Sequence, residues 1–237
     1  MNEDRIAKQK LSIILIVDAS KSMQGSRIAQ VDQAVLDIKD YLKDLEAESS
    51  NVDFYITIIP FNNDAYFYNQ QTSTLVDNFV YNGIKCGGWT NLHFAYARLG
   101  EILKKESQGG IMPDFGGVAP IILLLTDGHP TGDDYKEELN KIRHLPWFKV
   151  ALRYGIAIDL DDKRTSEVLN DFVNGNGDVI KCIDVNVLQK IIKIIILTAS
   201  KVKSTTSNIT YQNSKNQTMV AQQEIAEALS DYENWEW

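Results

Sequence analysis

Residues 11–18 read LSIILIVD, an apolar run that is interrupted only by Ser12 and ends in an aspartate. A short run rich in β-branched residues predicts a strand that is buried on both faces of a parallel sheet. A second run, residues 119–126 (APIILLLT), is even more apolar and is followed by Asp127. Because helices must cover both faces of such strands, these two runs favour an α/β fold.

Helix and strand patterns alternate outward from these runs. Apolar residues recur at three- and four-residue steps over residues 28–45, which predicts a helix. The other expected helices cover residues 91–105, 135–142, 165–173 and 185–203. The other expected strands cover residues 52–60, 148–158 and 179–183, with 64–68 as a short antiparallel edge strand and 72–79 as an ambiguous segment that could be a short helix. The sequence therefore predicts a doubly wound, mostly parallel, Rossmann-like sheet with helices on both faces.

The chain divides into three parts by composition. Residues 1–10 form a charged N-terminal extension, residues 11–203 a single α/β domain, and residues 204–237 a polar tail. The tail is rich in Ser, Thr, Asn and Gln and closes with DYENWEW, which is acidic and aromatic. Both a docking peptide and a segment without fixed structure are compatible with this composition.

The overall composition argues against several classes of protein. A net charge of −8 over 237 residues argues against nucleic-acid binding, which needs a basic face. Cys86 and Cys182 form no CxxC motif, so zinc and disulfide frameworks are not expected and a reducing compartment fits. The N-terminus is charged rather than apolar, and no apolar run approaches the ~20 residues that cross a bilayer. We expect a soluble, cytoplasmic protein without a membrane partner.

Candidate ligand-binding residues lie where strands end. Asp18 begins the pattern DASKS with Ser20 and Ser22, Thr90 lies in GGWTN, and Asp127 lies in TDG. In a doubly wound sheet, ligands bind beyond the carboxyl ends of the strands, so these side chains are expected to converge. All five supply hard oxygen atoms, which favours Mg²⁺, with Mn²⁺ as its substitute. Two carboxylates underfill such a site, so an acidic group from elsewhere could complete it.

In the DxSxS motif, the aspartate and the two serines are two residues apart, so their side chains are expected to point the same way from an extended turn. Gly25 permits an unusual backbone angle before the next helix. Trp89 is expected either to rim the metal face or to fold onto the sheet. Cys86 is expected to be a buried, inert thiol. Asp and Ser also cap helices, so DxSxS by itself is a weak signal.

The order DxSxS, GGxTN and TDG resembles the von Willebrand factor A domain family and its metal-ion-dependent adhesion site. The resemblance covers residues 11–203 and implies that Asp18, Ser20, Ser22, Thr90 and Asp127 bind the metal directly or through water. It also implies that a protein partner supplies an Asp or Glu to the open metal position. The segments DASKSMQG and LLLTDGHPTGDD look most similar to stand-alone bacterial proteins of the tellurite-resistance type, which are encoded beside a phosphatase and a kinase-like protein.

The leading hypothesis is therefore a magnesium-dependent interaction module, not an enzyme, in a bacterial stress-response or signalling system with a kinase and a phosphatase as partners. No P-loop and no GxGxxG after a strand is present in the sequence. The alternative is a magnesium-dependent phosphohydrolase or phosphotransferase with Asp18 as the phosphorylated nucleophile. Enzymes of that kind carry a second acid two residues later, where this chain has Ser20.

Overall fold

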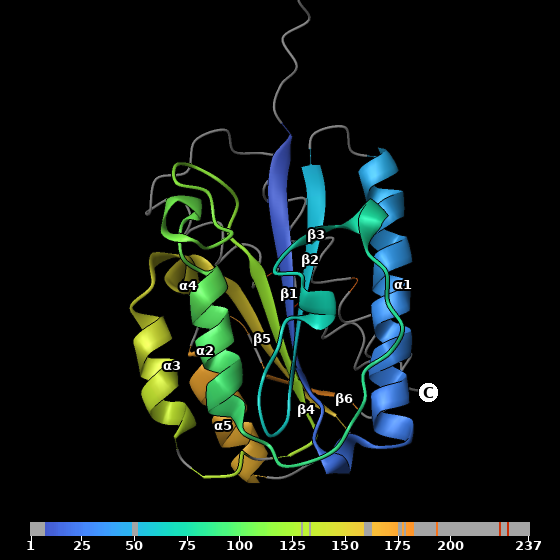
Figure 1. The fold of residues 1–237 in the computed structure, drawn as a ribbon, viewed down its shortest axis with the longest axis vertical. Helices are drawn as coiled ribbons and strands as arrows, with labels where there is room; N and C mark the ends of the chain where they lie inside the picture. Colours follow the sequence, from blue (N-terminus) through green and yellow to red (C-terminus); the bar gives the residue numbers. More distant parts are fainter. Residues whose placement is uncertain are drawn as a thin grey trace, which may run out of the picture.

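A six-stranded sheet forms the centre of the molecule, with the strand order β3-β2-β1-β4-β5-β6 (Figure 1). The computed structural model describes residues 8–48, 52–128, 130–132, 134–158, 163–174, 177, 179–182, 193, 223 and 227. The strands are β1 (Gln9–Asp18), β2 (Val52–Phe61), β3 (Thr74–Leu75), β4 (Ile121–Thr126), β5 (Leu152–Ile158) and β6 (Val179–Cys182). Every pair is parallel except β2 with β3. The predicted mostly parallel sheet with one antiparallel edge strand is confirmed.

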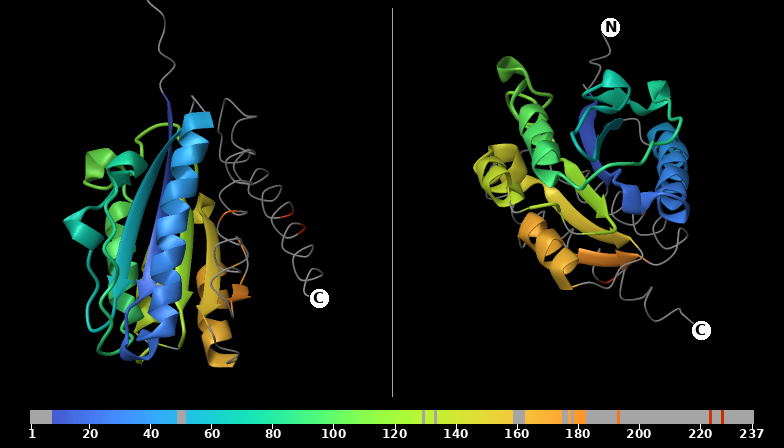
Figure 2. Two further views of the ribbon diagram at one scale, coloured as in Figure 1. Left: turned by 90° about the vertical axis from the view of Figure 1, so that its right-hand side faces the viewer. Right: turned by 60° about the horizontal axis from the view of Figure 1, so that its bottom comes forward.

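Helices cover both faces of this sheet. The described α-helices are α1 (Ser26–Glu48), α2 (Leu92–Ile102), α3 (Tyr135–Arg143), α4 (Pro146–Val150) and α5 (Lys163–Val173). Figure 2 shows α1 on one side of the sheet and α2, α3 and α5 on the other. Two separate clusters of buried apolar side chains fill the spaces between the sheet and these two layers.

Strand β1 separates the two cores. Its odd-numbered residues, from Leu11 to Val17, pack in the cluster that contains α1, whereas Ile14 and Ile16 pack in the cluster that contains α2. All of these side chains are almost fully buried. Because both faces of the strand meet a helix layer, polar and apolar residues do not alternate along it, and Ser12, the polar residue within the run, is itself buried. This explains the nearly continuous apolar run from which the fold class was predicted.

Two predicted strands are wrong in part. Residues 64–68 form no strand, since the tight turn after β2 allows only one antiparallel bridge, between Phe61 and Ala65. The antiparallel edge strand is instead β3, which pairs with Tyr55 and Ile56 and is followed by a 3₁₀ turn, Val76–Asn78. This turn agrees with the short helix considered for residues 72–79.

The predicted strand at 148–158 begins too early. Residues 146–150 form the short helix α4, which starts with Pro146 in the first turn, where its fixed φ and missing N–H are tolerated. Strand β5 begins only at Leu152. The apolar residues of α4 face the same core as a strand would, so hydrophobicity alone did not separate the two states.

The remaining predicted elements agree with the structure to within a few residues at their ends. The helix expected at 185–203 and the tail at 204–237 lie outside the described residues, apart from the isolated positions 193, 223 and 227. Among the residues that the structure describes, no helix has both the length and the apolar character needed to cross a membrane.

Candidate metal site

The two aspartates meet at the topological switch point of the sheet. β1 lies between β2 and β4, so the chain leaves β1 toward one side and later returns on the other. Asp18 is the last residue of β1, and Asp127 directly follows β4, its parallel neighbour. This is the place where doubly wound sheets leave an opening for ligands. Both aspartates are almost completely buried.

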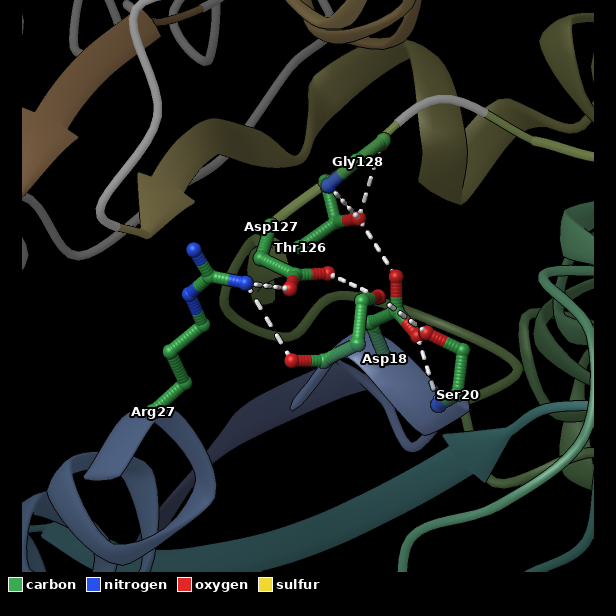
Figure 3. A network of polar contacts seen from close by, with 7 residues as sticks. Asp18, Ser20, Arg27, Thr126, Asp127 and Gly128 are labelled. Atoms are coloured by element: carbon green, nitrogen blue, oxygen red, sulfur yellow. Dashed lines mark hydrogen bonds and ion pairs between the residues drawn. The ribbon is translucent and has the colours of Figure 1, made fainter. Parts of the chain in front are cut away.

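Asp18 is fixed through both of its carboxylate oxygens. The backbone N–H of Ser20 donates to Oδ1 (2.8 Å), and the hydroxyl of Thr126 donates to Oδ2 (2.6 Å) (Figure 3). Burial nevertheless raises the pKa of Asp18 to about 6, because desolvation of the charged form outweighs these hydrogen bonds. Thr126 was not predicted as a site residue, although its place directly before Asp127 would have been a signal.

The two serines connect the aspartates. The Ser20 and Ser22 hydroxyl oxygens lie 3.0 Å apart, and the Ser22 hydroxyl donates to Asp127 Oδ1 at 2.8 Å. The expectation that DxSxS points its side chains in one direction is therefore confirmed. The turn is extended only as far as Ser20, because Lys21–Met23 form a 3₁₀ turn. Gly25 has φ +88°, the unusual backbone angle expected of it.

Backbone hydrogen bonds connect the glycine-rich loop, residues 87–91, to the DxSxS turn. The Gly87 N–H donates to the Ala19 carbonyl (2.8 Å), and the Lys21 N–H donates to the Gly88 carbonyl (3.2 Å). Gly88 has φ +82°, and a Cβ atom there would lie 2.6 Å from the Asn63 side chain, so only glycine fits. The Asn63 carboxamide oxygen instead accepts the Trp89 N–H at 2.9 Å. These contacts hold the loop at the sheet edge.

A pocket of about 480 Å³ opens between this loop and the DxSxS turn. Its lining residues are Ser20, Lys21, Ser22, Gly88, Trp89, Thr90 and Thr131. Thr90 thus shares the pocket with both serines, and its N–H and carbonyl are held by Thr131. Trp89 is 68% exposed, so it rims the pocket rather than folding onto the sheet. The structure therefore links four of the five predicted residues by hydrogen bonds and places Thr90 across the pocket.

A second site residue was also missed by sequence reasoning. Arg27, in the first turn of α1, donates to Asp127 Oδ2 at 2.7 Å and to the Ser22 carbonyl at 3.2 Å (Figure 3). Its side chain is 28% exposed, whereas that of Asp127 is fully buried. A positive charge at a helix N-terminus is unfavourable by itself, and this local conflict was the available signal.

The donor set suits a hard divalent cation. The Ser22 hydroxyl gives its proton to Asp127, so the Ser20 hydroxyl donates to Ser22, and one lone pair of the Ser22 oxygen is left for a metal ion in the pocket. Hydroxyl and carboxylate oxygens match Mg²⁺ and Mn²⁺ rather than thiophilic metals. Among the described residues there is no group of three or more His, Cys, Asp or Glu side chains that could hold a metal. Among the described residues, the site offers the two carboxylates of Asp18 and Asp127.

Cys86 is half-buried rather than buried as expected, and desolvation raises the pKa of its thiol to about 11, which keeps the reactive thiolate scarce at neutral pH.

Comparison with known proteins identifies the fold and the family. The family model of the von Willebrand factor type A domain matches residues 12–194. The chain belongs to this family. Domains of this family are commonly metal-dependent protein-interaction modules.

Curated relatives share part of the domain. Inter-alpha-trypsin inhibitor heavy chain H4 of Bos taurus is 28% identical over 134 residues, which is 54% of this chain and 14% of the relative. Heavy chain H2 of Mesocricetus auratus is 32% identical over 143 residues, 60% of this chain and again 14% of the relative. The matched region therefore spans only a small part of these much longer proteins.

Solved structures agree in fold at low identity. BatB from Bacteroides thetaiotaomicron has a TM-score of 0.53 at 16% identity, with 81% of this chain and 99% of that chain covered. Proximal thread matrix protein 1 from the mussel byssus has a TM-score of 0.52 at 18% identity, covering 80% of this chain and 48% of that chain. These similarities confirm the Rossmann-like α/β fold.

Proposed function

We propose that this chain is a metal-dependent protein-interaction module whose pocket binds an Asp or Glu of a partner protein through a divalent cation. Asp18, Ser20, Ser22, Thr90 and Asp127 would hold the cation, directly or through water. The bound cation would supply a Lewis-acidic position for the partner's carboxylate. The observation that carries the proposal is the hydrogen-bonded group of two buried carboxylates and two hydroxyls that adjoins an open pocket.

The identity of the cation follows from the donor atoms. Every proposed ligand is an oxygen atom, and three of the five are uncharged hydroxyls. A site with two carboxylates favours a cation that keeps several waters, as Mg²⁺ does, with Mn²⁺ as a close substitute. We propose Mg²⁺ as the physiological ion.

The biological setting is a proposal from the sequence resemblance. Similarity to stand-alone tellurite-resistance-type proteins supports a role in a bacterial stress response, in the cytoplasm, with a Ser/Thr kinase and a phosphatase as partners. The acidic net charge of −8 supports protein rather than nucleic-acid partners.

The burial of Asp18 argues against the alternative of a phosphotransferase. A nucleophilic carboxylate must contact the phosphorus atom directly, whereas Asp18 has no exposed surface and is not among the residues that line the pocket. Coordination of a cation through water needs no such direct contact. We therefore propose a non-enzymatic role. Turnover of a generic phosphoester that is lost in Asp18→Asn would contradict it.

Metal binding is the first test. Isothermal titration of the full chain with MgCl₂ and MnCl₂ should show one site, and Thr90→Ala should weaken it about tenfold or more by removing one ligand. Asp40→Asn is the matched control, because Asp40 lies exposed on α1. Equal affinity in Thr90→Ala and wild type, or no uptake of either metal by the folded protein, would contradict the proposal.

Partner capture is the second test. Immobilised wild-type protein should retain its partner in Mg²⁺ and release it in EDTA, and Thr90→Ala should retain little in either buffer. Substitution of the partner's contacting Asp or Glu by its amide should abolish retention. Recovery of the same partners with and without EDTA would show that the metal does not bridge the two proteins.

A further inference from the structure

Lys21 lies in the wall of the pocket beside the candidate metal site. Among the described residues that line this pocket it is the only charged one, and the others are two serines, two threonines, a glycine and a tryptophan. Lys21 stands between Ser20 and Ser22 in the DxSxS turn, so its charge belongs to the same turn as two proposed metal ligands. The whole chain carries a net charge of −8, so a positive charge at this place favours an anionic ligand.

The backbone of Lys21 is held in place, whereas its side chain is not. Its N–H donates to the Gly88 carbonyl at 3.2 Å, and its carbonyl accepts the Gln24 N–H at 3.2 Å. The residue is exposed, and within the part of the chain that the structure describes its ammonium group has no hydrogen bond, ion pair or aromatic contact. Lys21 is therefore anchored at the pocket with its charge available to a ligand.

The carboxylate that would pair with Lys21 has to come from the ligand. None of the described lining residues is acidic, and the wall across from the DxSxS turn is formed by Gly88, Trp89 and Thr90. When one partner carboxylate binds the cation, the neighbouring residues of the partner lie over the pocket. A lysine ammonium on its flexible four-carbon stem suits a contact with such a neighbour. The pocket volume of about 480 Å³ leaves room for more than one short side chain.

We infer that Lys21 binds a second carboxylate of the partner, so that the pocket selects segments with two acidic residues close together over segments with one. This inference rests on the proposed function, in which the first carboxylate binds the cation. The cation attracts a single acid of any partner, whereas Lys21 discriminates between partners by what stands beside that acid. An exposed pair of opposite charges changes affinity only modestly, so the expected preference is about threefold to fivefold.

The test compares short peptides that differ in one carboxylate. Three peptides carry an Asp followed by a Glu one, two or three residues later, and each has a matched peptide with Gln in place of the Glu. Binding to the full chain in excess Mg²⁺ is measured by nuclear magnetic resonance titration at constant ionic strength. In wild type, at least one Asp–Glu peptide should bind about threefold to fivefold more tightly than its Gln match.

Lys21→Met and Lys104→Met remove the same charge from different places. Lys104 is exposed and follows the C-terminal end of α2, whereas Thr90 of the pocket precedes the N-terminal end of that helix. Lys21→Met should lose the preference for the second carboxylate, and Lys104→Met should keep it. Lys21→Arg, which retains the positive charge, should also keep the preference. Lys21→Met should melt at the temperature of wild type in EDTA, because the replaced side chain is exposed.

Two results would overturn this inference and leave the proposed function intact. One is that no Asp–Glu peptide binds wild type more tightly than its Gln match. The other is that Lys21→Met weakens both members of each pair by the same factor, which would show that Lys21 attracts anions without contacting a second carboxylate. Binding of the Gln peptides that is equal in Mg²⁺ and EDTA, or no binding of any peptide in Mg²⁺, would contradict the proposed function and this inference together.

Discussion

Asp18→Asn should stabilise the metal-free protein at neutral pH although it removes a proposed metal ligand. In the folded chain the pKa of Asp18 is about 6, raised from its ordinary 3.8 mainly by burial. The folded state therefore binds this proton more tightly than the unfolded state does. The resulting stabilisation is fully present below about pH 4 and is lost as the pH rises through 6. Full loss corresponds to ~3 kcal/mol of unfolding free energy.

Asparagine carries no charge, so it avoids the free-energy cost of burying a carboxylate and still keeps the local hydrogen bonds. Its carbonyl oxygen can still accept the Ser20 N–H, and its amide can donate to Thr126 Oγ1. The Thr126 hydroxyl can then turn to the Gly128 carbonyl, which lies 3.0 Å away. We therefore expect Asp18→Asn to be more stable than wild type by ~2–3 kcal/mol at pH 8 in EDTA, and by much less at pH 4.5.

Urea unfolding followed by circular dichroism at both pH values measures this difference. Comparison of the two proteins at each pH cancels the other titrating groups. Added Mg²⁺ should stabilise Asp18→Asn less than wild type, because the substitution removes one of the two negative charges among the proposed ligands. A variant that is less stable than wild type at pH 8 in EDTA, or a difference that does not change with pH, would refute the assignment of the cost to the buried charge.

Three further predictions concern other parts of the domain. Trp89→Ala should leave the unfolding free energy within about 0.5 kcal/mol of wild type, because the side chain is mostly exposed, while weakening partner binding in a titration. Arg153→Met should cost ~3 kcal/mol in urea unfolding, because the buried guanidinium donates to the Phe148, Phe172 and Val173 carbonyls at the ends of α4 and α5; a cost below about 1 kcal/mol would contradict this role. In a Cys182→Ser variant, alkylation of Cys86 by iodoacetamide should keep rising up to about pH 11, since its raised pKa keeps the thiolate scarce at lower pH; a plateau near pH 8.5 would show an unperturbed thiol.

The fold could be predicted closely where local pattern and burial agree. Strands β1 and β4 are buried on both faces, so their apolar runs carry a direct signal. The prediction was wrong where burial does not distinguish helix from strand, as at Phe148 in α4, and where a sheet edge is set by few hydrogen bonds, as at β3. In both places a long-range contact rather than a local preference decides the structure.

Some residues of the candidate site could likewise be predicted from sequence, and others could not. Four of the five predicted residues could be selected from residue type and position after strands: Asp18, Ser20, Ser22 and Asp127. Thr90 follows no strand, and it was selected because the loop GGWTN opens a helix and matches the family pattern. Arg27 and Thr126 were not selected. Their sequence signals, a positive charge in the first turn of a helix and a place directly before Asp127, are weak, and only their contacts show the roles. Whether Trp89 is exposed also required the structure.

The sequence by itself determined the α/β class and the residue types at the ends of its strands, because these follow from periodicity and chain order. Only the tertiary structure decided that an arginine from α1 neutralises Asp127 and that a threonine from β4 holds Asp18, because both contacts join segments about one hundred residues apart. The charge balance of a buried site depends on which charged side chains lie close together in space, and the order of residues along the chain does not show this.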